Sequence, residues 1–155
     1  MLKLINPTEL SQQAFRQKSR TILYIVVHCT AGNVNASIVD VLDVFKRKGW
    51  KRPGYHFVIT KDGKIWQLVS TSCYSNGVKN HNFHSINISY TGGVNQDDMR
   101  TPCDTRTEAQ KLSLVALLKK LRKDYPNAKI LGHCDFPEVK KACPSFNAKK
   151  EYSNL

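Results

Sequence analysis

The apolar run at residues 22–27 constrains the fold of this 155-residue chain more than any other segment. Its residues are mostly β-branched or aromatic and almost uninterrupted, a pattern typical of a strand that is covered on both faces of its sheet. The predicted strand spans residues 21–28 and delivers His28 at its end. The rest of the chain must therefore supply further strands and covering helices.

Two amphipathic helices are expected. The first follows the candidate N-cap Asn35 and ends at Gly49, with apolar residues at helical spacing: Ile38, Val41, Leu42 and Phe45. The second begins with a capping box formed by Thr107 and Gln110 and ends before Pro126, with one leucine face: Leu114, Leu117, Leu118 and Leu121. Each helix has one apolar face to lay on a sheet.

Four more strands are expected, at residues 55–60, 65–69, 85–90 and 128–132. The pair Asp62-Gly63 separates the first two and is typical of a two-residue hairpin turn, so these strands should be antiparallel. Strands that alternate with helices indicate an α/β fold. We therefore expect a single domain at residues 21–155, with a central mixed β-sheet flanked by helices, after an N-terminal lead at residues 1–20.

Charge and apolar content restrict the partners and the location. With 24 Lys and Arg against 12 Asp and Glu, the net charge of +12 favours an anionic partner such as nucleic acid, anionic lipid or the bacterial wall. No window approaches the roughly 20 apolar residues of a membrane span, so membrane insertion is not expected. Residues 1–20 lack the apolar core of a signal peptide, which predicts synthesis in the cytoplasm.

Five cysteines are present, an odd number that fits thiols or a metal ligand better than a disulfide framework: Cys29, Cys73, Cys103, Cys134 and Cys143. A catalytic zinc site uses three imidazole or thiolate ligands and leaves a fourth position to water. His28 and His133 lie at or just past predicted strand ends, and Cys143 follows in a loop, so these three could form such a site. Their spacing alone leaves open a set of buried polar residues and a thiol without metal.

Four segments in the sequence strengthen the zinc hypothesis. They are Val27-His28-Cys29-Thr30-Ala31, Gly54-Tyr55-His56-Phe57, Ser85-Ile86-Asn87-Ile88 with Gly92-Gly93, and Gly132-His133 with Lys141-Ala142-Cys143-Pro144-Ser145-Phe146. In this order they resemble the phage-lysozyme type of N-acetylmuramoyl-L-alanine amidase, in the superfamily that includes the peptidoglycan recognition proteins. The resemblance implies a zinc-dependent hydrolase, a phage-type endolysin, that cleaves the amide bond between N-acetylmuramic acid and L-alanine in peptidoglycan.

The same resemblance implies a role for each matched residue. His28, His133 and Cys143 would be the Zn²⁺ ligands, Tyr55 a catalytic residue, and Lys141 the cation beside the reacting carbonyl. Tyr55 and Lys141 would stabilise charge on the carbonyl oxygen or handle the proton. The enzyme is expected to be a monomer that acts on the wall after release from the cytoplasm.

The chain departs from this family in two places. Asn87 stands where the family often has glycine, and Tyr74-Ser75-Asn76-Gly77 stands where it often has a histidine segment, with His81 and His84 displaced. The roles of Tyr74, His81 and His84 therefore stay open.

Residues that neighbour the candidate site are expected to face away from it. Cys29, Cys134 and His56 each follow a proposed site residue, so strand alternation should turn them toward the core. Trp50 and Trp66 are expected to pack.

Three other functions remain. A cytoplasmic amidase that recycles soluble muropeptides would share the chemistry, and wall activity would separate the two. A recognition module that binds peptidoglycan without cutting it generally lacks the cysteine ligand, which is present here as Cys143. Nucleic-acid binding depends on charge alone, and no nucleic-acid module is found, so no nucleic-acid partner is expected.

Overall fold

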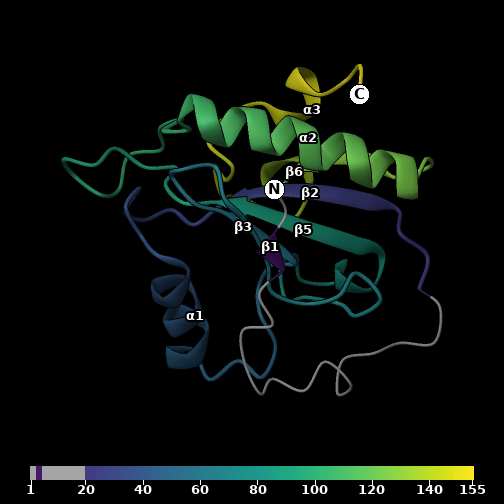
Figure 1. Cartoon of the computed structure of the whole chain (residues 1–155), viewed down its shortest axis with the longest axis horizontal. Coiled ribbons are helices and arrows are strands. Elements are labelled where there is room, and N and C mark those ends of the chain that lie inside the picture. Colours follow the sequence, from purple (N-terminus) through teal and green to yellow (C-terminus); the bar gives the residue numbers. More distant parts are fainter. Residues whose placement is uncertain (1–2, 5–19) are drawn as a thin grey trace.

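The computed structural model describes residues 3–4 and 20–155 and shows one α/β domain (Figure 1). Its six-stranded sheet has the order β1-β4-β3-β5-β2-β6. The strands are β1 (Lys3–Leu4), β2 (Tyr24–Cys29), β3 (Phe57–Ile59), β4 (Ile65–Gln67), β5 (Ser85–Tyr90) and β6 (Lys129–Gly132). Neighbours are parallel except β3 and β4, so the predicted mixed sheet is confirmed. The expected lead at residues 1–20 lies outside the described residues except for β1 and Arg20.

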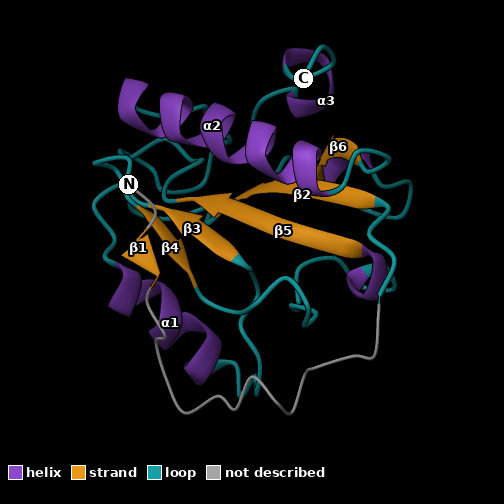
Figure 2. Ribbon diagram, turned by 45° about the vertical axis from the view of Figure 1, so that its right-hand side comes forward, coloured by secondary structure: helices purple, strands orange, loops and turns teal. Residues whose placement is uncertain are grey.

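Helices cover both faces of this sheet (Figure 2). They are α1 (Ile38–Arg47), α2 (Glu108–Asp124) and α3 (Ala148–Glu151), with short 3₁₀ turns η2 (Asn82–His84) and η3 (His133–Asp135). The long helix α2 and the short helix α3 lie on one face and α1 on the other. Within residues 3–4 and 20–155, none of the helices has the length and apolar character needed to cross a bilayer.

Helix α1 begins two residues later than the sequence predicted. Its N-cap is Ser37, whose Oγ accepts from the Asp40 N–H at 3.2 Å while the Asp40 carboxylate accepts from the Ser37 N–H at 2.8 Å. This reciprocal box satisfies two backbone donors, more than a single cap would. Asn35 instead accepts a hydrogen bond from Lys61 through its side chain, so its assignment as the N-cap was wrong.

The hairpin between β3 and β4 is antiparallel as predicted, but its turn is longer. The Thr60 N–H donates to the Lys64 carbonyl at 3.0 Å, and the Gly63 N–H donates to the Thr60 carbonyl at 2.8 Å. Three residues, 61–63, therefore form the loop, and the predicted two-residue turn was wrong. Gly63 has φ +82°, the left-handed conformation that closes a three-residue hairpin.

Alternation along the central strands separates an apolar face from a polar one. On the α2 side, Ile25, Val27 and Cys29 pack with the predicted leucine face of α2. On the opposite side, β2, β5 and the residue before β3 turn polar side chains inward, each no more than 1% exposed: His28, His56, Asn87 and Ser89. Buried polar groups of this kind require partners, and they lie on the α1 side of the sheet.

Candidate active site

Two histidines meet at the ends of neighbouring parallel strands. In the pairing of β2 with β6, Val27 lies opposite Gly132, so the next residue of each chain segment is a histidine. The rings of His28 and His133 have centroids 4.7 Å apart. The carboxyl ends of parallel strands are the usual ligand-binding edge of an open α/β sheet.

Cys143 reaches the same edge from a loop that is bonded to β2, β5 and the turn η3. Its Sγ accepts from the Cys29 N–H at 3.2 Å, and its carbonyl accepts from the Cys134 N–H at 2.8 Å. Just beyond it, the Tyr90 hydroxyl donates to the Pro144 carbonyl at 2.6 Å. These bonds fix the sulfur beside the end of β2.

His28, His133 and Cys143 each present one nitrogen or sulfur atom, and these atoms lie within 4.8 Å of one another. Burial, aided by His133, lowers the pKa of His28 to about 3, and burial followed by the charge of Lys141 lowers the pKa of His133. Both imidazoles are therefore neutral at neutral pH and have a lone pair to offer. The contact with Cys29, followed by burial, raises the pKa of the Cys143 thiol, a shift that coordination of a cation would reverse. Two imidazoles and one thiolate are a donor set that fits catalytic zinc.

The same three residues line a pocket of about 420 Å³. Tyr55 and Lys141 also line it, so all five predicted site residues share one cavity. The Tyr55 ring lies 5.2 Å from the His28 ring, and burial raises the pKa of Tyr55, which keeps its hydroxyl as a donor. Lys141 is exposed. Part of the lining comes from α1 and the residue after it and carries charge: Asp40, Arg47 and Lys48.

The three residues whose roles were open do not belong to this cavity. Tyr74 lies under the Arg52 guanidinium, 3.8 Å from its ring centroid. His81 pairs with Glu138, and the Nδ1 atom of His84 lies 2.9 Å from the Thr21 carbonyl oxygen. Tyr74, His81 and His84 are not among the described residues that line the pocket.

The cysteines beside the candidate ligands differ in environment. Cys29 lies in the core, 4% exposed, as predicted. Cys134 is only half-buried, so the prediction of a core position for it was wrong. The strand ends at Gly132 and the chain continues into η3, where the alternation of a strand no longer applies. No disulfide joins the five cysteines, each of which lies in the described part of the chain.

The sequence did not reveal how buried residues support the site. His56 is fully buried on the α1 side and lies outside the group of candidate ligands. Asn87 places its Oδ1 2.8 Å from the Nε2 of His28. The replacement of glycine by asparagine was the only signal of this contact. The pocket lining also includes Asn76 and Gly77, from the segment that departs from the family, and Asn33, which no motif identified.

Known proteins resemble this chain in sequence and in fold. Residues 18–146 match the model of a family described as N-acetylmuramoyl-L-alanine amidase. The endolysin of Escherichia phage T7 is 32% identical over 143 residues, 91% of each chain. The endolysin of Enterobacteria phage T3 is 33% identical over 128 residues, 81% of this chain and 82% of the other.

Solved structures show the same fold. The N-acetylmuramoyl-L-alanine amidase LysC from Clostridium intestinale URNW superposes with a TM-score of 0.76 and 25% identity, over 98% of this chain and 93% of the other. Drosophila PGRP-LB superposes with a TM-score of 0.69 over 88% of this chain and 82% of the other. At 18% identity, this second likeness concerns the fold alone.

Proposed function

Because the chain belongs to the N-acetylmuramoyl-L-alanine amidase family, we propose that it is a zinc-dependent hydrolase that cleaves the amide between N-acetylmuramic acid and L-alanine in peptidoglycan. The observation that carries the proposal is the cluster of His28, His133 and Cys143, which opens into the pocket that Tyr55 and Lys141 also line. The two imidazoles and the thiolate would hold the metal and leave one position open. A zinc ion held there would supply Lewis-acid polarisation of the amide carbonyl and an activated water at neutral pH.

The protein's own side chains would orient the amide and stabilise its charge. The Tyr55 hydroxyl, protonated and next to His28, would donate a hydrogen bond to the carbonyl oxygen as negative charge develops on it. The Lys141 ammonium, whose charge already acts on His133, would stabilise the same charge. Arg47 and Lys48, which also line the pocket, would attract the carboxylates of the peptide stem.

The relatives named endolysins and the net charge of +12 support a role on the intact wall. We propose that the protein is made in the cytoplasm and acts as a monomer on the anionic wall after release. A recycling amidase would act on soluble muropeptides and leave intact walls unchanged.

Metal analysis combined with a wall assay tests the proposal. Wild-type protein should hold about one zinc per chain, clear intact walls and release new amino termini from them. Cys143→Ser should lose zinc, because a hydroxyl is a poor ligand in place of thiolate. Cys134→Ser is the matched control and should keep it. Unchanged zinc content in Cys143→Ser would remove this residue from the site.

The two residues assigned to the transition state need a separate test. Tyr55→Phe and Lys141→Ala should keep zinc and the fold, and each should lose about 10²- to 10³-fold in turnover. KM should change less than kcat. Normal turnover in both variants would contradict the assignment. If wild-type protein binds peptidoglycan but releases no amino termini, it is a recognition module.

A further inference from the structure

We infer that Asn87 is a positioning residue that holds His28 with its proton on Nε2, so that the Nδ1 lone pair of His28 faces the metal. The inference rests on the metal site of the proposed function and concerns the side of that site away from the pocket. It is based on four buried side chains, each no more than 1% exposed. Each is hydrogen-bonded to the next in this order: His28, Asn87, Ser75 and His56.

The hydrogen bonds between them form a continuous chain. His28 Nε2 lies 2.8 Å from Asn87 Oδ1, and Asn87 Nδ2 lies 2.8 Å from Ser75 Oγ. Ser75 Oγ lies 3.1 Å from His56 Nδ1, and His56 Nε2 lies 2.9 Å from the Cys73 carbonyl oxygen. The chain thus runs from a candidate metal ligand to a fixed backbone acceptor.

A backbone group sets the direction of the chain. The Asn87 N–H lies 3.0 Å from His56 Nδ1, and a backbone N–H can only donate. His56 Nδ1 must therefore be an acceptor, which places the His56 proton on Nε2, where it donates to the Cys73 carbonyl.

The opposite tautomer of His56 would satisfy Arg20, whose Nη2 lies 3.1 Å from His56 Nε2. It would leave the buried Asn87 N–H facing another donor and would remove the donor from the Cys73 carbonyl. Arg20 already donates to other backbone carbonyls: those of Thr71, Asn82 and Ser85. A buried polar group that loses its bond is costly, so the tautomer that serves the two backbone groups prevails.

From His56 the direction passes to His28. Because His56 Nδ1 carries no proton, the Ser75 hydroxyl can only donate to it, and it shares the Nδ1 lone pair with the Asn87 N–H. The Ser75 oxygen then accepts from Asn87 Nδ2, so the Asn87 amide turns its oxygen toward His28. An amide oxygen only accepts, and His28 must therefore carry its proton on Nε2. A histidine that binds a metal usually donates its other N–H to such a partner, which fixes the ring and its tautomer.

The packing around Asn87 leaves room for this side chain. A Cβ at Gly77 would lie 2.3 Å from the Cγ of Asn87, so the loop at residues 74–77 can close over the amide only with glycine there. The hydrogen-bonded network thus depends on the loop at residues 74–77 as well as on β5.

Histidine ring spectra of zinc-free protein test the tautomer directly. In long-range ¹H–¹⁵N spectra, His28 of the wild type should carry its proton on Nε2. Asn87→Leu keeps the size and loses the acceptor, so it should lose this preference and weaken zinc binding about 10- to 100-fold in a chelator competition. Asn87→Asp retains an oxygen toward His28 and should keep the Nε2–H form of the wild type.

Two further variants separate positioning from folding. Ser75→Ala breaks the next bond of the chain and should shift the His28 tautomer in the same direction, less strongly. Ser89→Ala removes a buried hydroxyl that lies on the same face of β5 but does not belong to the hydrogen-bonded chain. It should leave the His28 tautomer and the zinc affinity unchanged.

Two results would overturn the inference: a wild-type His28 with its proton on Nδ1, or an Asn87→Leu variant that keeps both the tautomer and the zinc affinity. If the wild type binds no zinc while its His28 tautomer still depends on Asn87, the proposed function fails and the hydrogen-bond chain stands.

Discussion

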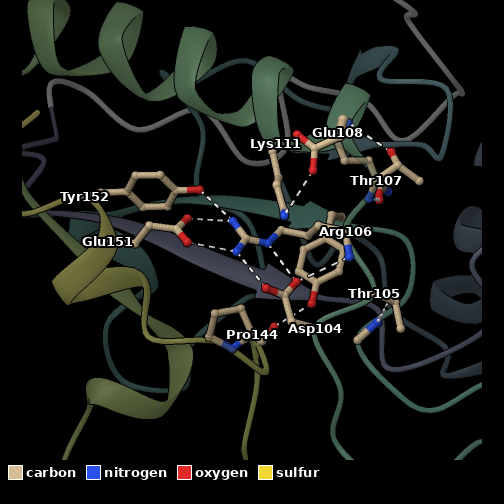
Figure 3. Close-up of polar contacts among 12 residues, drawn as sticks. Asp104, Thr105, Arg106, Thr107, Glu108, Lys111, Pro144, Glu151 and Tyr152 are labelled. Carbon is tan, nitrogen blue, oxygen red and sulfur yellow. Dashed lines mark hydrogen bonds and ion pairs between the residues drawn. The ribbon is translucent and has the colours of Figure 1, made fainter.

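Arg106 ties the C-terminal segment to the loop before α2, and its replacement should destabilise the fold. Its side chain is 1% exposed and donates to the Asp104 carboxylate at 2.8 Å, to the Glu151 carboxylate at 2.7 and 3.0 Å, and to the Tyr152 hydroxyl at 2.9 Å (Figure 3). The guanidinium also lies over the Phe146 ring, 3.3 Å from its centroid. The Arg106 side chain thus connects Asp104, two residues before it, with residues 146–152 near the C-terminus.

The loss in free energy of unfolding caused by Arg106→Met depends on how well water can solvate its former partners. Breaking a buried ion pair costs about 3–5 kcal/mol when the remaining charge stays buried. Asp104 and Glu151 are 34% and 46% exposed, so water can solvate them again once the guanidinium is gone. We therefore expect the low end, about 3 kcal/mol. For a domain of this size, that loss lowers Tm by about 6–12 °C.

Urea and thermal unfolding of zinc-free protein measure this effect. Lys120→Met is the matched control, because its exposed pair with Asp124 should contribute no more than about 0.5 kcal/mol. Glu151→Gln should cost about 1 kcal/mol, and the double variant with Arg106→Met should lose less than the sum of the two. A Tm of Arg106→Met within about 3 °C of wild type would refute the reasoning.

Two other predictions concern pH and salt. Burial, followed by the charge of Arg20, lowers the pKa of His56 to about 3, so the unfolded chain takes up a proton below about pH 6.5 that the folded chain refuses. Stability of zinc-free protein should fall by about 1.4 kcal/mol per pH unit from this group as pH drops below 6.5, and His56→Gln should lose that part of the slope in urea titrations. Clearing of intact walls should fall steeply with added salt while cleavage of a soluble muropeptide falls little, and Lys149→Gln with Lys150→Gln should reduce the difference. Equal salt dependence on both substrates would contradict wall capture by charge.

Much of the fold could be predicted because its signals are local. The run at residues 22–27 supplies four of the six residues of β2, and the leucine face from Leu114 to Leu121 packs α2 on the sheet. The candidate ligands His28 and His133 could be placed at strand ends from sequence, and parallel pairing of β2 with β6 brings them together. Both inferences need only the period of each element and the edge at which parallel strands end.

The features that could not be predicted from the sequence depend on the pairing register of neighbouring strands and on the residue at which a strand ends. Asn87 reaches His28 only because β2 and β5 pair with Val26 opposite Asn87, a register that neither strand specifies alone. Cys134 does not lie in the core because β6 ends at Gly132, two residues before it. The length of the hairpin loop is set by two backbone hydrogen bonds, from Thr60 to Lys64 and from Gly63 to Thr60. The pair Asp62-Gly63 in the sequence does not predict them.

The two supports of the candidate metal site come from opposite faces of the sheet. On the α2 side, Tyr90 bonds to Pro144 and Arg106 stacks on Phe146, so that face sets the segment that carries Cys143. On the α1 side, Asn87 bonds to His28. His28 comes from β2 and His133 from the residue after β6, whereas Cys143 comes from a loop that Tyr90 anchors. The buried polar residues of one face and the ion pairs of the other thus serve the same three atoms.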